Sequence, residues 1–362
     1  MHKIKKIMTL HIFNPDHDIA LVSNLENFTP PHAARQLRRD LGLLPAVWAS
    51  EESCVLVDDE AVANLLWRSM SRKLGDKRKP RIVTRDSLAK EAVDRIEPWG
   101  WDLALRSRLL RYGVGEHLLP TRERINEIRL LSHRRSSCRL LPLLRTEGTV
   151  GEARECNSLA EVSELMNQWG KVVAKAPWSS SGRGIRFLSG TLTLQEEGWL
   201  RNVLSQQGSV MIEPYYRKIK DFGMEFSCDA LGRVTYQGLS LFSTQNGAYQ
   251  GNVLATESAK RSMMESFLPL DLLDKMKCRI CEEAQTLLAG RYEGPFGVDM
   301  MVVGGNGEFL LHPCVEINLR RTMGHVAIAL SKAMNPDEDD ERQGVMRIHY
   351  SENRYRLRIA SL

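Results

Sequence analysis

Short apolar runs alternate with longer amphipathic stretches through the first third of the chain. The runs with strand character are IMTLHIF (7–13), PAVWA (45–49), CVLVDD (54–59) and RIVT (81–84). Helical patterns occupy PPHAARQLRRDLG (30–42) and EAVANLLWRSMSRKLG (60–75), and the first opens with prolines, which the first turn of a helix tolerates. Strands and helices in alternation predict a small parallel α/β domain over residues 1–118.

The pattern changes after about residue 146, where strands are separated by glycine turns. The strand-like segments are KVVAKAP (171–177), GIRFLSG (184–190), SVMIEPYY (209–216), MEFSCDALGRVTYQGLSLFST (224–244) and GPFGVDMMVVGGNGEFLLHPCVEINLR (294–320). The turns DALGR and GGNGE lie between alternating runs, which is typical of hairpins. This half is therefore expected to form antiparallel sheets with a few helices, and the tail MRIHYSENRYRLRI (346–359) to add a last hairpin.

An arginine-rich segment joins the two halves, with ten arginines between Arg106 and Arg145. A nucleic-acid face would need aromatic side chains among the basic ones, and few are present. Leu and Ile recur at helical spacing, so we favour a solvated helix pair acting as a linker. The predicted segments are 1–118 (α/β domain), 119–145 (helical linker), 146–210, 211–335 and 336–362 (C-terminal tail).

Composition narrows the possible partners and the cellular compartment of the protein. The 362 residues are 43% hydrophobic and carry a formal net charge of +5, which suits anionic small molecules without requiring nucleic acid. Seven scattered cysteines favour a reducing compartment, and the pair Cys278 and Cys281 lies in a helical pattern that offers no second metal-binding pair. No run approaches the ~20 apolar residues of a membrane span, and the N-terminal run has no cleavage site. We expect a cytoplasmic protein that does not enter a membrane.

The stretch VVAKAPWSSSGRGIRFL (172–188) places Lys175 at the end of an apolar strand, before a Ser- and Gly-rich loop. A lysine and such a loop suggest phosphate binding. In a P-loop the lysine follows the glycines, whereas Lys175 precedes them, so this motif is absent. No GxGxxG fingerprint occurs either. A protein kinase is disfavoured: although Asp221-Phe222-Gly223 spells DFG, no HRD-type loop occurs and only 46 residues separate the aspartate from Lys175.

Five motifs follow one another in an order that differs from the P-loop, Rossmann and kinase arrangements. They are VVAK with SSSGRG (172–184), MIEPYY (211–216), FGMEF (222–226), GPFGVDMMV (294–302) and CVEINLR (314–320). Together they resemble the ATP-grasp superfamily over residues 120–335. The resemblance implies an α/β and α+β protein, in which a small parallel N-terminal domain precedes a two-lobed ATP-grasp fold of antiparallel sheets with helices.

The nucleotide site implied by this resemblance begins with Lys175, whose ammonium group would meet phosphates while backbone N–H groups of the loop close over them as a lid. A plain hairpin turn is the alternative for this loop. Glu213 would bind the adenine amine or the ribose, although a strand end that buries Tyr215 is an alternative. The ATP-binding candidates are Arg134 (with Arg135 equally defensible), Lys175, Ser180, Ser181, Gly182, Arg183, Gly184, Glu213, Pro214, Tyr215, Tyr216 and Glu225.

The metal candidates are Asp299, Glu316 and Asn318. Asp299 lies inside an apolar strand, where an unpaired carboxylate would cost several kcal/mol. Glu316 and Asn318 are two positions apart, so they face the same side of a strand. Oxygen ligands of this kind suit Mg²⁺, with Mn²⁺ as an alternative. Salt bridging to Arg320 is the other explanation for these carboxylates.

The superfamily resemblance implies ATP-dependent ligation, in which a carboxylate becomes an acyl-phosphate that an amine or similar nucleophile attacks. Lys175 and Arg320 are the catalytic candidates, because both would neutralise phosphate charge. ATP, Mg²⁺, a small carboxylate and an amine are the expected partners. A nucleotide-binding regulatory protein without turnover, or a kinase-like enzyme of this fold, is the alternative, and a homo-oligomer is left open.

The second substrate is expected at the first domain. FNPDHDIAL (13–21) follows a strand and carries Asn14, Asp16, His17 and Asp18, at the edge where α/β sheets bind ligands. A capped loop without function is the alternative. Arg321 and His325 follow Arg320 and are further substrate candidates. EPWGWD (97–102) is a second unusual group, whose tryptophans we expect in the core or at a domain contact.

Overall fold

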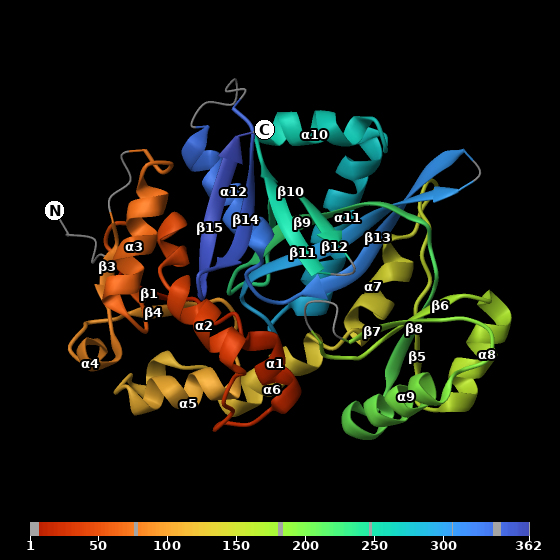
Figure 1. The fold of residues 1–362 in the computed structure, drawn as a ribbon, viewed down its shortest axis with the longest axis horizontal. Helices are drawn as coiled ribbons and strands as arrows, with labels where there is room; N and C mark the ends of the chain where they lie inside the picture. The colour runs from red at the N-terminus through yellow and green to blue at the C-terminus, as the bar shows by residue number, and fades with distance from the viewer. Residues whose placement is uncertain are drawn as a thin grey trace. The chain divides into compact units, whose positions relative to one another are not determined.

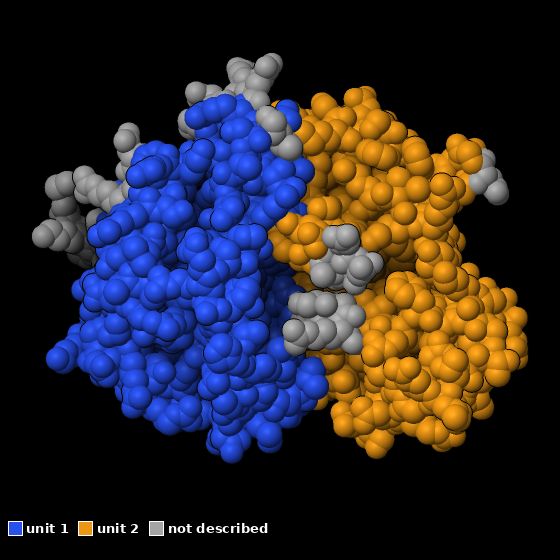
Figure 2. Space-filling model, in the orientation of Figure 1, with its two compact units in different colours: residues 1–126, 251–257, 320–362 blue, residues 127–250, 258–319 orange. Residues whose placement is uncertain are grey.

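A computed structural model describes residues 7–75, 79–179, 184–245, 248–305, 307–335 and 342–361. The chain forms two compact units, coloured separately in Figure 2. Unit 1 comprises residues 1–126, 251–257 and 320–362, and unit 2 comprises residues 127–250 and 258–319. The chain therefore leaves unit 1 and returns to it twice.

Unit 1 contains the predicted parallel sheet, in the strand order β3-β2-β1-β4. Its strands are β1 (Thr9–Ile12), β2 (Cys54–Leu56), β3 (Arg81–Val83) and β4 (Arg95–Pro98), and all three pairings are parallel. Its helices in this part of the chain are α1 (His17–Ser23), α2 (His32–Asp40), α3 (Glu60–Ser71), α4 (Arg85–Leu88) and α5 (Leu103–Arg111), with short 3₁₀ turns η1 (Leu44–Val47) and η2 (Glu116–Leu118) (Figure 1). The prediction of a small parallel α/β domain is confirmed.

One predicted strand in this unit is wrong. PAVWA lies over η1, where all four residues are buried and Trp48 N–H donates to the carbonyl of Pro45 (3.1 Å). A proline fixes φ near the value that a helical turn uses, so the run coils instead of extending. Continuous burial explains its apolar composition equally well in either conformation.

The order of the strands creates a switch point between β1 and β4. From β1 the chain proceeds to β2 and β3 on one side, and it then crosses to β4 on the other side of β1. The loops that follow β1 and β4 meet there, and Trp99 N–H donates to the carbonyl of Ile12 (2.7 Å). Trp99 is buried with its ring edge-on to Phe13, as a core residue. Ligands of open α/β sheets bind at such a point.

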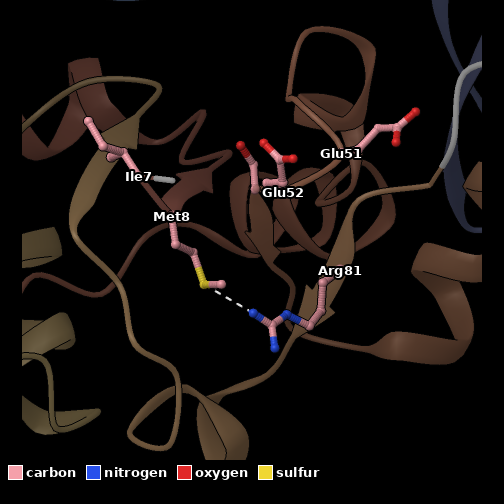
Figure 3. Close-up of a pocket in the computed structure, with 6 residues that line it drawn as sticks. Ile7, Met8, Glu51, Glu52 and Arg81 are labelled. Carbon is pink, nitrogen blue, oxygen red and sulfur yellow. Dashed lines mark hydrogen bonds between the residues drawn. The ribbon is translucent and has the colours of Figure 1, made fainter. Parts of the chain in front are cut away.

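A cavity of about 370 Å³ lies at the opposite, amino-terminal edge of these strands (Figure 3). Met8, Ser53 and Arg81 line it, and an Arg81 guanidinium nitrogen lies 3.0 Å from the sulfur of Met8. The predicted site residues lie elsewhere.

The C-terminal segment completes unit 1. α12 (Met323–Met334), β14 (Gly344–Ser351) and β15 (Arg354–Ser361) belong to it, and β14 pairs antiparallel with both β15 and the end of β11 (Ala248–Leu254). The predicted last hairpin is confirmed. One hydrophobic cluster joins this segment to the side chains around α2 and α3, and it contains Val326, Leu330, Met346 and Leu357. The tail is therefore part of a core.

Unit 2 begins with a four-stranded sheet in the order β5-β8-β6-β7. Its elements are α7 (Arg135–Leu144), β5 (Arg154–Cys156), α8 (Leu159–Trp169), β6 (Val172–Lys175), β7 (Ile185–Leu188), α9 (Leu194–Gln207) and β8 (Val210–Pro214). α6 (Arg122–Leu131) precedes α7, so the predicted helix pair is present. Val162, Leu200 and Val203 of α8 and α9 pack with strand residues in one cluster.

The second sheet of unit 2 contains β13-β12-β9-β10 in that order, all antiparallel. Its elements are β9 (Lys218–Cys228), β10 (Val234–Gln245), α10 (Glu257–Glu265), α11 (Leu270–Leu288), β12 (Gly294–Gly305) and β13 (Glu308–Asn318). Both predicted hairpins are confirmed, and Gly232 in the first turn has φ +79°, which favours glycine. Cys278 and Cys281 lie in α11 as predicted. Among the described residues, no helix is both long and apolar enough to span a bilayer.

Candidate functional site

Lys175 ends β6, and its ammonium group binds the carboxylate of Glu213 on the neighbouring strand β8. The Nζ atom lies 2.7 Å from Oε1 and 2.6 Å from Oε2, and both side chains are buried. The sequence assigned the two residues to different ends of a nucleotide, whereas the structure pairs them directly. Since an ammonium group has three N–H donors, Lys175 keeps capacity for a further acceptor.

Three neighbouring side chains respond to this pair. Burial, with the Glu213 charge second, raises the pKa of Cys138 to about 12. Burial also lowers the pKa of His312 to about 3, and the Lys175 charge adds to that effect. Burial raises the pKa of the Cys314 thiol, and both Glu213 and Asp299 contribute to the rise. Cys314 is therefore within electrostatic reach of both the lysine pair and the predicted metal strand.

Arg134 connects the beginning of the predicted phosphate loop to the predicted metal strand. Its Nη1 atom donates to the carbonyl of Ala176 and to Oγ of Ser179 (2.7 Å), while Nη2 lies 2.9 Å from Oε1 of Glu316. The neighbouring Arg135 instead forms an ion pair with Glu155. Of the two arginines that the sequence left open, Arg134 is the one that contacts other predicted site residues.

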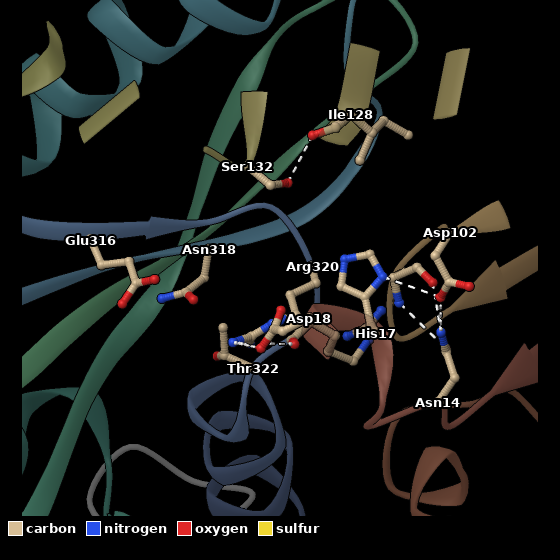
Figure 4. Close-up of polar contacts among 12 residues, drawn as sticks. Asn14, His17, Asp18, Asp102, Ile128, Ser132, Glu316, Asn318, Arg320 and Thr322 are labelled. Atoms are coloured by element: carbon tan, nitrogen blue, oxygen red, sulfur yellow. Dashed lines mark hydrogen bonds and ion pairs between the residues drawn. The ribbon is translucent and has the colours of Figure 1, made fainter. Parts of the chain in front are cut away.

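Asp299, Glu316 and Asn318 lie together on two adjacent strands. Asp299 is the register partner of Glu316, and Gly297 is the partner of Asn318. The Nδ2 atom of Asn318 donates to Oδ2 of Asp299 (3.0 Å). Figure 4 shows Glu316 and Asn318 projecting from the same side of β13. The three metal candidates therefore share one face of the sheet.

Glu225 lies on the same face. Gly297 of β12 is in register with Glu225 on β9 and with Asn318 on β13, so the three residues form one row across three strands. In the next row, Gly223 lies beside Asp299, and a Cβ atom at Gly223 would lie 3.4 Å from Oδ1 of Asp299. Register partners project to the same side. Glycines at 223 and 297 therefore leave room between the acidic side chains.

This donor set suits Mg²⁺ bound together with phosphates. Across the ranges that the structure describes, no group of three or more His, Cys, Asp or Glu side chains is arranged to hold a metal alone. Two carboxylates and an amide oxygen remain, which matches the few protein ligands that Mg²⁺ takes when phosphates supply the others. Glu316 pairs with Arg134, and Arg320 pairs with Asp18.

The segment from Pro214 to Tyr216 follows β8. Tyr215 is 43% exposed, so burial does not explain it, and Lys171 Nζ lies 3.7 Å from its ring centre. Tyr215 N–H donates to the carbonyl of Lys171 (2.9 Å) and Pro214 has no N–H. Neither main-chain nitrogen of Pro214 and Tyr215 is therefore available as a donor to a ligand.

His312 is a site residue that the sequence did not indicate. It is fully buried, its ring lies edge-on to Tyr216 at 5.5 Å, and within the described part of the chain both ring nitrogens are without a hydrogen-bond partner. Its sequence context HPCVEIN offered no signal beyond its place four residues before Glu316.

Ser180, Ser181, Gly182 and Arg183, which the sequence predicted as the lid, lie outside the described residues. The residues that flank them approach closely. Ala176 N–H donates to the carbonyl of Gly184 (2.8 Å), and a Cβ atom at Gly184 would lie 2.4 Å from Ser179. Only glycine fits at position 184.

In unit 1, Arg320 forms a two-pronged ion pair with Asp18, in the first turn of α1. Its Nε and Nη2 atoms lie 2.7 and 2.9 Å from the two carboxylate oxygens (Figure 4). Arg321 N–H donates to the carbonyl of Trp99 (2.8 Å). The predicted catalytic arginine and two predicted substrate residues therefore meet at the switch point between β1 and β4.

Asn14 and His17 converge on Asp102, which the sequence did not single out. Asn14 Nδ2 donates to Oδ2 of Asp102 (3.2 Å) and to the carbonyl of Gly100 (2.8 Å), and Nδ1 of His17 lies 3.4 Å from Oδ2 of Asp102 (Figure 4). Nε2 of His17 is buried and, in the described ranges, has no hydrogen-bond partner. The signal for Asp102 was its place after WGW, at the end of β4.

Two further substrate candidates have other surroundings. Asp16 is buried 3.7 Å from the Arg38 guanidinium, and burial raises its pKa. His325 takes part in a capping box with Thr322, whose N–H donates to Nδ1 of the ring (3.2 Å) at the start of α12. His325 therefore has a structural role at that helix end.

Comparisons with known proteins define the fold. No protein-family model matches the sequence, and no curated protein matches it either. Solved structures do match: N5-carboxyaminoimidazole synthetase from Staphylococcus aureus, complexed with ADP, has a TM-score of 0.50 at 13% identity, covering 98% of this chain and 85% of that one.

Two biotin carboxylase structures agree with this match. The enzyme from Campylobacter jejuni, in a complex with an ATP analogue, has a TM-score of 0.52 at 13% identity, covering 95% of this chain and 76% of that one. The biotin carboxylase domain of 2-oxoglutarate carboxylase from Hydrogenobacter thermophilus, with MgADP and bicarbonate, has a TM-score of 0.52 at 12% identity, covering 95% and 75%. The chain has the ATP-grasp fold, as the order of its motifs predicted.

Proposed function

We propose that the protein is an ATP-dependent ligase that activates a carboxylate for attack by an amine or similar nucleophile. One observation carries the proposal: Arg134 bonds Ala176 and Ser179, at the start of the phosphate loop, and also Glu316 on the metal strand. A cation held between a loop of this kind and a carboxylate suits a polyphosphate that carries a metal ion.

The nucleotide would lie in unit 2. Lys175 and Arg134 would bind its phosphates, with the loop from Ser179 to Gly184 closing over them. Glu213 orients Lys175, because its two oxygens fix the ammonium group at the end of β6. The segment from Pro214 to Tyr216 would bind the base. Support comes from similar structures described as complexes with ADP, MgADP or an ATP analogue.

Mg²⁺, with Mn²⁺ as an alternative, would be held by Asp299, Glu316 and Asn318. When bound, the metal neutralises phosphate charge as the γ-phosphoryl group transfers. Arg134 fixes the orientation of Glu316, and the contact from Asn318 fixes Asp299. Glu225 faces the same side and is the further acidic candidate.

The proposed reaction has two steps. An oxygen of the substrate carboxylate attacks the γ-phosphorus, the bond to the β–γ bridging oxygen breaks, and ADP leaves. The nucleophile nitrogen then bonds to the acyl carbon, the bond to the phosphate oxygen breaks with its electron pair, and the amine proton passes to solvent. Lys175 and Arg320 would stabilise the charge that develops on the phosphate oxygens.

The acceptor substrate would meet unit 1 at the switch point, where Asn14, Asp16, His17 and Asp18 lie. Asp18 holds the guanidinium of Arg320 in a fixed orientation. Arg321 and His325 follow in the same segment.

The test measures ATP binding by calorimetry with and without Mg²⁺, followed by phosphate release across pools of small carboxylates and amines. Asp299→Asn and Glu316→Gln should remove the Mg²⁺-dependent part of ATP affinity, while Glu308→Gln, at the exposed far end of β13, should leave it unchanged. Phosphate release that needs both an acid and an amine establishes ligation. ATP binding without any release would replace the proposal with a regulatory role, and transfer of phosphate to one substrate alone would indicate a kinase.

A further inference from the structure

The side chain of Trp178 holds the start of the predicted phosphate loop against α6. Its indole N–H donates to the carbonyl of Arg129 (2.9 Å), and the guanidinium carbon of Arg129 lies 3.9 Å from the centre of the indole ring. The imidazole of His133 meets the indole edge-on, with 4.5 Å between the ring centres. Three contacts of different kinds therefore fix one partly buried side chain.

His133 is itself held in place as a neutral ring. Its Nδ1 atom accepts from the main-chain N–H of Arg135 (3.0 Å), and its Nε2 atom lies 3.4 Å from the hydroxyl oxygen of Ser209. Burial lowers the pKa of His133 to about 4, and the charge of Arg135 adds to that effect. The ring that His133 offers to Trp178 is therefore uncharged throughout the neutral pH range.

The main chain beside Trp178 is fixed as well. Trp178 N–H donates to Oε1 of Gln207, the last residue of α9 (2.9 Å). The carbonyl of Pro177 accepts from the main-chain N–H of Arg134 (3.2 Å), and the hydroxyl of Ser179 accepts from the Arg134 guanidinium (2.7 Å). The segment on both sides of Trp178 is therefore tied to helices of unit 2.

The contacts of Trp178 determine where the Arg134 guanidinium lies. Arg134 is bonded to the carbonyl of Ala176 and to Ser179, and its other guanidinium nitrogen lies 2.9 Å from Glu316. Movement of the segment around Trp178 would break the first two bonds. Binding groups that are ordered in advance lose less conformational entropy when a ligand binds, so an anchored segment gives a higher affinity.

We propose that Trp178 is a positioning residue of the phosphate site, which fixes its segment so that Arg134 is ordered to bind a polyphosphate. Its anchor is made by Arg129, His133 and Gln207. The inference rests on the proposed binding of ATP in unit 2. It adds to that proposal a residue that acts on the phosphates through Arg134.

The test measures the binding of MgATP and of magnesium tripolyphosphate to the full-length protein by calorimetry. Trp178→Ala should weaken both at least tenfold. Trp178→Phe keeps an aromatic ring between Arg129 and His133, so its affinities should be within threefold of the wild type. Trp199→Ala is the matched control, because Trp199 is also partly buried in unit 2 and lies 5.0 Å from the guanidinium carbon of Arg186. It should change either affinity less than twofold.

A second measurement asks whether Trp178 acts through Arg134. In the Arg134→Gln background, Trp178→Ala should change the affinity for MgATP less than twofold, because the guanidinium that Trp178 positions has been removed. Independent effects would instead multiply. A tenfold loss in both backgrounds overturns the proposal.

Stability is measured separately by thermal melting. Trp178→Ala and Trp199→Ala should both melt below the wild type, so lower stability by itself does not predict weaker binding. If Trp178→Ala does not fold, Gln207→Leu provides the test, because it removes one anchoring contact without changing any charge. It should weaken MgATP binding at least threefold, whereas Gln206→Leu, at the exposed neighbouring position, should not.

Two failures are distinguishable. Wild-type affinity for both ligands in Trp178→Ala, or in Gln207→Leu where the alanine variant does not fold, overturns this inference alone. A wild-type protein that binds neither MgATP nor tripolyphosphate overturns the proposed function together with this inference.

Discussion

The buried pair of Lys175 and Glu213 offers the sharpest test of the candidate site. The perturbation is a double-mutant cycle: Lys175→Met, Glu213→Leu and the two together. The ammonium nitrogen lies 2.6 and 2.7 Å from the carboxylate oxygens, and both side chains are more than nine-tenths buried. Removing either partner leaves the other as an uncompensated charge in the interior.

The magnitude follows from that burial. Breaking a buried ion pair from one side costs about 3–5 kcal/mol, whereas replacing both partners by apolar side chains is often neutral or stabilising. We therefore expect each single variant to lose about 3–5 kcal/mol and the double variant to lose less than about 2 kcal/mol. The sum of the single losses should exceed the loss of the double variant by several kcal/mol, in contrast to the additivity of independent sites.

The assay is urea unfolding at pH 7, with the slope against urea compared among variants to confirm that each unfolds in the same manner. Lys171→Met is the matched control. Lys171 is exposed and its ammonium group lies over the ring of Tyr215, so its loss should change stability by less than about 1 kcal/mol. The double variant, if it folds as expected, should not bind ATP. Single losses below about 1 kcal/mol that simply add would refute the reasoning, and normal ATP binding by the double variant would remove Lys175 from the nucleotide site.

Three other predictions follow from individual contacts. Arg134→Gln should weaken ATP binding at least tenfold by calorimetry, whereas Arg135→Gln should change it less than twofold; equal effects would contradict the assignment. The folded pKa of His312, about 3, lies below its ordinary value of 6.5, so the unfolded chain takes up the proton first and stability falls as pH drops below 6.5. Between pH 7 and 5 the wild type should lose about 2 kcal/mol of unfolding free energy from this histidine, measured by urea unfolding. His312→Leu should lose about 2 kcal/mol less over the same pH range. An equal loss in the two proteins counts against burial of a neutral ring. Gly100→Ala should cost about 1–3 kcal/mol, because its Cβ would lie 2.7 Å from the ring of His17, and an unchanged melting temperature would argue against this packing.

The hairpins of unit 2 could be predicted because their signals are local. In β12 and β13, alternating apolar positions flank a glycine turn, and a carboxylate inside an apolar run marks Asp299 as exceptional. Spacing alone put Glu316 and Asn318 on one face. These properties depend on the period of two in a strand, which the sequence displays directly.

Conformation was harder to predict where burial was uniform. The run that contains Pro45 is buried throughout, so no alternation separates strand from turn, and it coils into η1. β4 was missed for the opposite reason: Arg95 and Glu97 give it a polar appearance, although it pairs with β1 over four residues. A short strand at the edge of a sheet needs little apolar surface.

Contacts between residues far apart in sequence could not be predicted from local patterns. Lys175 and Glu213 are 38 residues apart and meet only because β6 and β8 are neighbours in their sheet. Asp102 is 85 positions away from His17 in the sequence, and their contact depends on the adjacency of β1 and β4. Sequence reasoning named His17 without its partner, since strand order is not written in either segment.

The contacts of Arg134 show what the local sequence predicts and what only the fold decides. The sequence placed a basic residue upstream of the first lid strand but did not separate Arg134 from Arg135, because adjacent residues at the start of a helix have similar patterns. The fold separates them: one side chain reaches Ser179 and Glu316, while the other reaches Glu155. Both arginines therefore have a carboxylate partner, and only Arg134 also bonds the beginning of the predicted phosphate loop. The proposal that nucleotide phosphates bind in unit 2 thus depends on Arg134 and not on Arg135, and the comparison of Arg134→Gln with Arg135→Gln tests that difference directly.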